Sequence, residues 1–163
     1  MIEDKNGDKV LNAYGVLKFL HVVAVVFWVG GIAALSVAVW RLRKERNREV
    51  LAAILRQASF FGQRVAGPAS FIVLLTGPMM VGMAHIGFGT FWVLWGFAGL
   101  TAHFWIGATA LRKRTNALLQ LASASSGDEA ALLAAARRLW STQLIYLAIM
   151  AAVVAAMVLK PTL

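Results

Sequence analysis

Four long apolar stretches, separated by polar or charged segments, dominate the chain. A helix needs about 20 apolar residues to cross the hydrocarbon core of a bilayer, and three of the stretches reach that length unaided. The fourth becomes long enough if residues 139–143 continue the same helix, and its span is expected at about 142–159. The pattern predicts an all-α membrane protein: a four-transmembrane-helix bundle that occupies residues 1–163 as one domain, with spans at Tyr14–Trp40, Val65–Ile86, Phe91–Leu111 and about Leu144–Leu159.

Basic residues gather in two of the connections between these spans. The connection at 41–64 carries seven basic side chains against two acidic ones, and the connection at 112–138 carries five against two. The turn at 84–90 has no charged residue. Because loops rich in Lys and Arg stay in the cytoplasm, we expect both long connections inside and both termini outside, in a bacterial inner membrane.

Helical periodicity predicts two further packing features. The segment 49–61 places Val50, Ile54, Ala58 and Phe61 on one side, which predicts a helix that continues from the first span or lies at the interface. In the first span, Gly30 lies nearly opposite the face of His21, next to two alanines. Small residues favour close contact between membrane helices, so we expect this glycine face to pack against another helix.

Composition excludes several classes of function. Apolar residues make up 60% of the chain, against roughly 45–50% in soluble proteins. There is no cysteine, which excludes disulfides, thiolate metal sites and iron–sulfur clusters. The predicted spans contain no Asp or Glu, which argues against a proton pump or a carboxylate-driven transporter. The net charge of +9 follows the predicted topology, so nucleic-acid binding is not expected.

His103 lies deep in the third predicted span. It follows Phe91 by twelve residues, or about 18 Å of helix, which places it near the middle of a hydrocarbon core about 30 Å thick. Gly96, Gly99 and Gly107 share its helical face. An ionisable residue at this depth is a functional hypothesis, and glycines would let a flat porphyrin lie against the backbone. The alternative is a packing stripe in which His103 bonds to a neighbouring helix.

The other two histidines lie toward the outer side of the predicted bundle. His21 shares a helical face with Trp28, and His85 ends the second span. Methionine sulfur suits Cu(I), and three methionines come just before His85: Met79, Met80 and Met83. Because Met79 and Met83 point well away from His85 on a helix, one compact copper site on this span alone is not favoured.

Short motifs in three spans resemble known families of small bacterial membrane proteins. The motifs are LKFLHV at 17–22, WVGG at 28–31, TGP at 76–78 and MVLKP at 157–161. The first two resemble a group that includes the copper-resistance D-type membrane domain and a related family of predicted integral membrane proteins without assigned function. The last two are similar to the latter family. The first span also resembles membrane-type protoporphyrinogen oxidase, which binds haem b. The chain departs from that oxidase at 34–37, which read ALSV. That resemblance therefore implies a haem held by His21 rather than the oxidase activity.

The leading hypothesis is a haem b-binding bundle that acts as an electron-transfer or quinone-linked subunit. Its axial ligands would be His21 and either His103 or His85, and Trp105 would lie beside the ring with Trp28. The full set of candidate cofactor-binding residues is His21, His103, His85, Trp28, Gly99 and Gly107.

Two alternatives remain open beside the haem hypothesis. One is copper binding or transport on the periplasmic side, through His21, His85 and the outer methionines. The other is an accessory subunit without a cofactor. In each case the expected partners are the lipid bilayer and other membrane subunits or a second copy of the chain. A redox or accessory subunit is expected rather than a stand-alone enzyme.

Overall fold

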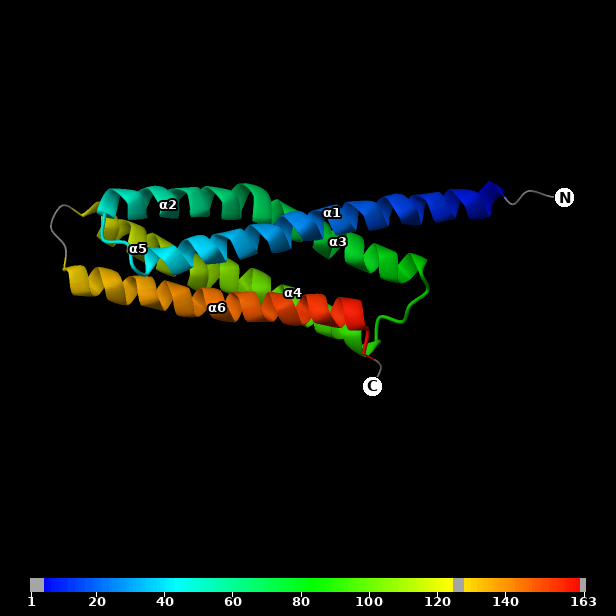
Figure 1. Cartoon of the computed structure of the whole chain (residues 1–163). Helices are drawn as coiled ribbons and strands as arrows, with labels where there is room; N and C mark the ends of the chain where they lie inside the picture. Colours follow the sequence, from blue (N-terminus) through cyan, green and yellow to red (C-terminus); the bar gives the residue numbers. More distant parts are fainter. Residues whose placement is uncertain (1–4, 125–127, 162–163) are drawn as a thin grey trace.

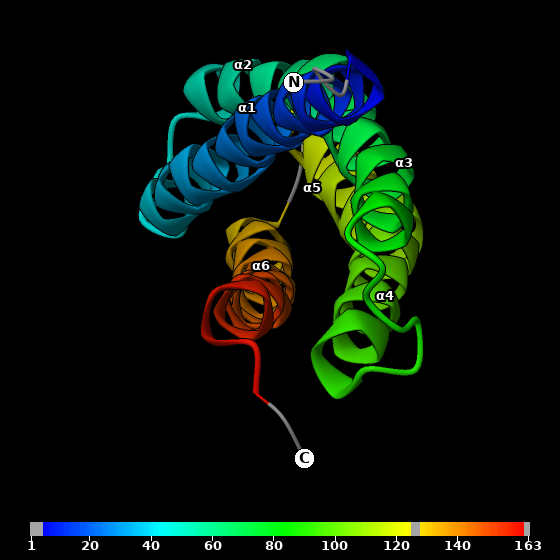
Figure 2. The same ribbon diagram turned by 90° about the vertical axis from the view of Figure 1, so that its right-hand side faces the viewer.

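The computed structural model describes residues 5–124 and 128–161, with side chains from Asn12 onward. Every regular element in this part of the chain is a helix, which confirms the predicted all-α class (Figure 1). The elements are α1 (Lys5–Leu42), α2 (Arg48–Phe61), η1 (Gly62–Ala66), α3 (Gly67–Met83), α4 (Phe91–Ile106), η2 (Gly107–Leu111), α5 (Arg112–Ser123) and α6 (Glu129–Leu159). Because η1 and η2 are π-helical segments within continuous helices, these elements form four rods (Figures 1 and 2).

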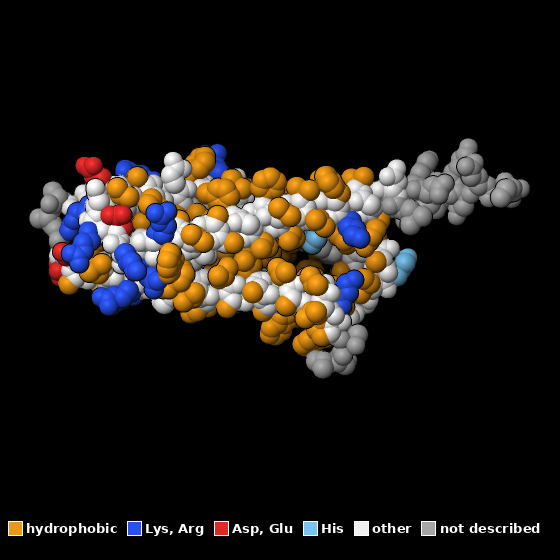
Figure 3. Space-filling view, in the orientation of Figure 1, with side chains coloured by type: hydrophobic (Ala, Val, Ile, Leu, Met, Phe, Trp, Pro, Cys, Tyr) orange, Lys and Arg blue, Asp and Glu red, His pale blue; other side chains and the backbone are white. Residues whose placement is uncertain are grey.

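All four rods are longer than a bilayer is thick. The described spans run over 31, 36, 33 and 31 residues, or about 46–54 Å, against a hydrocarbon core of about 30 Å. Lys and Arg side chains gather at one end of the molecule, over α2, α5 and the beginning of α6 (Figure 3). We call this the basic end, and the end formed by the beginnings of α1 and α4 the opposite end. The helices therefore extend out of the bilayer at the basic end, which we expect to face the cytoplasm.

The segment 49–61 is helical as predicted, but it belongs to the second rod rather than the first. The chain leaves helical geometry after Leu42, and α2 begins at Arg48. The side chain of Asn47 caps this new helix by accepting hydrogen bonds from the backbone N–H groups of Glu49 and Val50. From there α2 runs through η1 into α3 without a break. The expected continuation from the first span is therefore wrong, because a capped turn separates the two helices.

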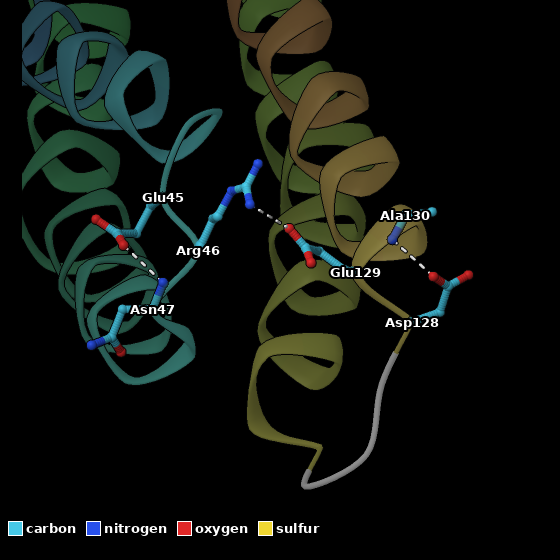
Figure 4. Close-up of polar contacts among 6 residues, drawn as sticks. All are labelled: Glu45, Arg46, Asn47, Asp128, Glu129 and Ala130. Atoms are coloured by element: carbon cyan, nitrogen blue, oxygen red, sulfur yellow. Dashed lines mark hydrogen bonds and ion pairs between the residues drawn. The ribbon is translucent and has the colours of Figure 1, made fainter.

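The polar contacts drawn in Figure 4, at the tip of the basic end, are exposed. Glu45 accepts a hydrogen bond of 2.8 Å from the backbone N–H of Asn47, and Asp128 caps α6 by accepting one from Ala130. Arg46 and Glu129 form an ion pair of 3.5 Å between side chains that are 79% and 60% exposed. Such exposed pairs contribute little stability, so packing must hold this end together.

Two clusters of buried side chains form the core. One joins α1, α2, α5 and α6 at the basic end; the other joins α1, η1, α3, α4 and α6 in the middle of the bundle. The outer surface is also apolar, as the exposed fractions of Phe19 (65%), Phe71 (56%) and Trp105 (70%) show. Such exposure is favourable in a bilayer, because these side chains contact lipid tails rather than water.

In the glycine pair of α1, Gly31 packs against another helix, whereas the prediction was that Gly30 would do so. A Cβ atom at Gly31 would overlap the ring of Phe61, whereas one at Gly30 would meet nothing within 4 Å. Gly31 therefore permits the close approach of α1 to the second rod. Gly30 faces outward with Ala33 and Ala34, so within the described residues the expected packing of the Gly30 face does not occur.

Candidate functional site

His103 lies in α4 between two aromatic side chains from other helices. It is 1% exposed. Its ring stacks on that of Tyr146 from α6, with centroids 3.6 Å apart and planes inclined by 24°. The indole of Trp28 from α1 meets it edge-on at 4.9 Å, and the Trp28 Nε1–H donates a hydrogen bond of 3.2 Å to His103 Nε2. These three residues, which we call the aromatic layer, join three helices in the middle of the bundle.

The Trp28 contact fixes the proton on the His103 imidazole. An indole nitrogen only donates, so Nε2 must accept, and the neutral ring carries its proton on Nδ1. Nδ1 is buried and has no hydrogen-bond partner among the described residues. A buried donor without a partner costs about 1–3 kcal/mol, so this N–H is a place where a ligand or water would be stabilised.

The glycines that share the His103 face bring α4 against α6. A Cβ at Gly96 would overlap Met157, one at Gly99 would overlap Val153, and one at Gly107 would lie 2.8 Å from the Tyr146 hydroxyl. The surface expected to take a flat macrocycle is thus occupied by side chains of α6. Gly99 and Gly107 serve close helix packing in this structure, the alternative that the sequence left open.

His21 is held by Thr76, the first residue of the TGP motif, for which the sequence indicated no binding role. The Nδ1 atom of His21 lies 2.7 Å from Thr76 Oγ1 of α3, and this hydroxyl also donates a hydrogen bond of 2.7 Å to the carbonyl of Ile72. The hydroxyl has one proton, which it donates to the Ile72 carbonyl. In the contact between His21 and Thr76, the His21 Nδ1–H must therefore be the donor. The Nε2 lone pair is then available, and it has no hydrogen-bond partner among the described residues.

A cavity of about 350 Å³ adjoins His21 in the half of the bundle at the opposite end. We call it the His21 cavity. Figures 1 and 2 show α1 and α6 diverging in this half, and Figure 3 shows a hollow there with a histidine at its edge. Its lining is mostly apolar. Besides His21, its lining includes Tyr14, Trp28, Gly77, Met80, Trp92, Gly96, Met157 and Lys160.

The remaining candidates lie outside this cavity. His103 and His85 are not among its lining residues, and His85 is exposed in the turn after α3 with a positive φ of 52°. Trp105, which was expected beside the haem ring with Trp28, is 70% exposed on the surface of the bundle and is not among the residues that line this cavity. Within the described residues, no three His, Asp or Glu side chains are grouped to hold a metal ion.

A second cavity, of about 260 Å³, lies on the other side of the aromatic layer. We call it the His103 cavity. Residues of both π-helical segments line it, and π-helical turns occur frequently at functional sites. Its polar lining includes His103, Tyr146 and Gln143, whose amide Nε2 donates a hydrogen bond of 2.9 Å to Ser36 Oγ.

Comparison with protein families assigns the chain to a family but does not assign it an activity. The family described as "Predicted integral membrane protein (DUF2269)" matches residues 15–161. The chain belongs to this family. No match was found among curated proteins or among solved structures. The DUF2269 assignment agrees with the resemblance to a family of predicted integral membrane proteins, whereas no named relative supports the resemblance to copper-resistance D or protoporphyrinogen oxidase.

The DUF2269 match spans all four rods, from the first span to the residue after Lys160. Both cavities and the aromatic layer fall within it, except for Tyr14 at the edge of the His21 cavity. The DUF2269 chain is thus an integral membrane protein with two partly open cavities that adjoin the aromatic layer.

Proposed function

We propose that this DUF2269 protein binds haem b in the His21 cavity and serves as an electron-transfer or quinone-linked subunit in the membrane. One observation carries the proposal: an imidazole with its Nδ1–H committed to Thr76 and its Nε2 free, next to an apolar cavity. Haem iron binds a neutral imidazole, and a hydrogen bond to the other ring nitrogen fixes the tautomer that ligation needs.

The chemistry of the cavity fits a porphyrin. Apolar and aromatic side chains, among them Trp28 and Trp92, suit the faces of a flat ring. Gly77 lies close to His21, since a Cβ there would be 3.8 Å from the His21 Cε1 atom. Lys160, whose Nζ lies 5.5 Å from the Trp92 ring, supplies positive charge for a propionate.

A methionine would supply a second ligand to the haem iron. Met80 of α3 and Met157 of α6 line the same cavity as His21, whereas the other two histidines do not. Methionine with histidine is an established axial pair for haem iron. When bound, haem b supplies a one-electron carrier. The protein would hold the His21 ring through Thr76 and exclude water with apolar side chains. Trp28 would line the cavity while it donates its hydrogen bond to His103.

An optical spectrum tests the proposal. The protein is produced with haem supplied, purified in nanodiscs, and scanned before and after reduction with dithionite. We expect sharp α and β bands of a b-type cytochrome, lost in His21→Ala. The exposed His85 provides the matched control, and His85→Ala should keep the bands. A wild-type protein that stays colourless under full haem supply would overturn the proposal.

Copper is a second candidate, because the structure places His21 and two thioethers around one cavity. His21, Met80 and Met157 offer one nitrogen and two sulfur donors, a set that suits Cu(I). This differs from the arrangement expected from sequence, in which His85 took part. Stoichiometric copper that is lost in Met157→Leu, from a protein without haem bands, would favour this candidate. A protein with neither cofactor that co-purifies with larger membrane subunits would favour the accessory role.

A further inference from the structure

Three polar side chains with unused hydrogen-bonding capacity line the His103 cavity. His103 has a buried Nδ1–H without a partner among the described residues. Gln143 is 3% exposed and its amide donates once, to Ser36; its carbonyl oxygen accepts no hydrogen bond from any residue that the structure describes. The Tyr146 hydroxyl also makes no hydrogen bond in the described part of the chain. Two donors and an acceptor thus remain unpaired on one cavity.

Their depth in the bilayer makes this arrangement costly. His103 lies about 18 Å along the helix from Phe91, near the bilayer midplane. An unpaired polar group in hydrocarbon costs several kcal/mol, because no water replaces the missing bond. Packing alone would have favoured apolar residues at these positions. Polar residues here indicate a ligand that offers both an acceptor and a donor.

The rest of the cavity limits what that ligand is. Apolar side chains, including Ile32, Leu55, Phe104 and Leu139, cover most of its lining. The basic group in it, Arg112, begins α5 and lies about 13 Å of helix from His103. A phospholipid would place its charged phosphate near Arg112 and leave the deep polar groups unpaired. A neutral ring with two oxygen atoms and an apolar tail would form hydrogen bonds with these deep polar groups.

We propose that the His103 cavity binds the ring of a membrane quinone. A ring carbonyl accepts from His103 Nδ1–H or from the Tyr146 hydroxyl, and in the reduced form a ring hydroxyl donates to the Gln143 carbonyl oxygen. The inference deepens the proposed function and rests on it for its redox meaning. The aromatic layer separates this cavity from the His21 cavity, with Trp28 lining one and bonded to His103, which lines the other.

Decylubiquinone binding to the full chain in nanodiscs tests the inference. Quenching of tryptophan fluorescence gives the Kd, and photolabelling with an azidoquinone, mapped by mass spectrometry, gives the location. We expect saturable binding, with label on α4 or α6 near His103. Tyr146→Phe keeps the ring that stacks on His103 and removes only the hydroxyl, and Gln143→Met keeps the length of the side chain. Each should raise Kd about five- to tenfold, which is the loss of one hydrogen bond.

Matched variants separate this inference from the haem proposal. Ile145→Val changes the neighbour of Tyr146 on the lipid-facing side, where Ile145 is 57% exposed, and should leave Kd unchanged. His21→Ala should abolish haem bands but preserve quinone affinity, while Tyr146→Phe should keep the haem bands and raise the Kd for quinone. The inference is overturned if binding is not saturable, if Tyr146→Phe and Gln143→Met both bind as tightly as wild type, or if the label maps away from this cavity.

Discussion

The Nδ1 atom of His21 and the hydroxyl oxygen of Thr76 lie 2.7 Å apart, and they join α1 to α3 beside the His21 cavity. The same hydroxyl donates to Ile72 of its own helix. A residue with no metal-binding chemistry of its own therefore decides which nitrogen of His21 is free. With haem bound as proposed, Thr76 would act as a positioning residue, and its effect should appear in cofactor affinity rather than in stability.

Thr76→Val removes the acceptor while keeping the shape of the side chain. Outer-shell partners of metal ligands typically contribute 10–100-fold to affinity, so we expect haem affinity to fall by about that factor. Thr76→Ser retains the hydroxyl and should bind haem as the wild type does. Titration of haem into apoprotein, followed at the Soret band, measures both. Equal affinity of the valine variant and wild type would contradict this role for Thr76.

The apolar pattern predicts the rods well, because lipid demands long apolar helices. The apolar pattern says less about where each helix ends, since the parts of a helix outside the bilayer need not be apolar. The apolar run of the second span begins at Val65, but its helix starts at Arg48 and is set by the cap at Asn47. Hydropathy measures the part of a helix that lies in hydrocarbon, and the charged part beyond it is invisible to that signal.

The sequence predicts where His103 lies along its helix but not its contacts. His103 is buried within α4, and its place near the bilayer midplane stays a prediction. Its partners, Trp28 and Tyr146, come from helices 75 and 43 residues away in sequence, and no local pattern encodes which helices adjoin. Thr76 gives one weak signal, a polar residue within an apolar span just before Gly77. Its contact with His21 depends on the same long-range packing.

Substitution by alanine should have opposite effects on stability at the two adjacent glycines of α1, Gly30 and Gly31. Gly31→Ala places a methyl group where the ring of Phe61 now lies, and overpacking of this kind costs about 1–3 kcal/mol. Gly30→Ala adds a methyl group in open space and improves helix propensity by up to about 1 kcal/mol. Thermal unfolding in detergent should show a lower Tm for Gly31→Ala and an unchanged or higher one for Gly30→Ala. Equal shifts in the two variants would show that Phe61 moves aside without cost.

Two arginines at the basic end offer a second matched pair. Arg48 donates from Nη1 to the carbonyls of Leu121 and Ala124 at the end of α5, at 3.1 and 2.9 Å. These carbonyls have no following helical turn to pair with, so Arg48 caps α5 from another rod. Arg48→Ala should lower stability by about 1–3 kcal/mol, measured as a fall in Tm. Arg46→Ala loses only the exposed pair with Glu129 and should cost less than about 1 kcal/mol. A larger effect at Arg46 than at Arg48 would refute this account of the basic end.

The distribution of charge predicts the orientation of all four rods. Residues 41–64 and 112–138 carry the dense Lys and Arg clusters at the basic end, and the positive-inside rule places that end in the cytoplasm. Alkaline phosphatase, which is active only outside the cytoplasm, should be active when fused after Leu163. Green fluorescent protein fused there, exported by the same route, should be dark. A fusion truncated after Ser123 gives the control from the same chain, because α5 ends at the basic end and both reporters should reverse. Matching signals at the two fusion points would mean that α6 does not cross the membrane, although its 31 residues are long enough to do so.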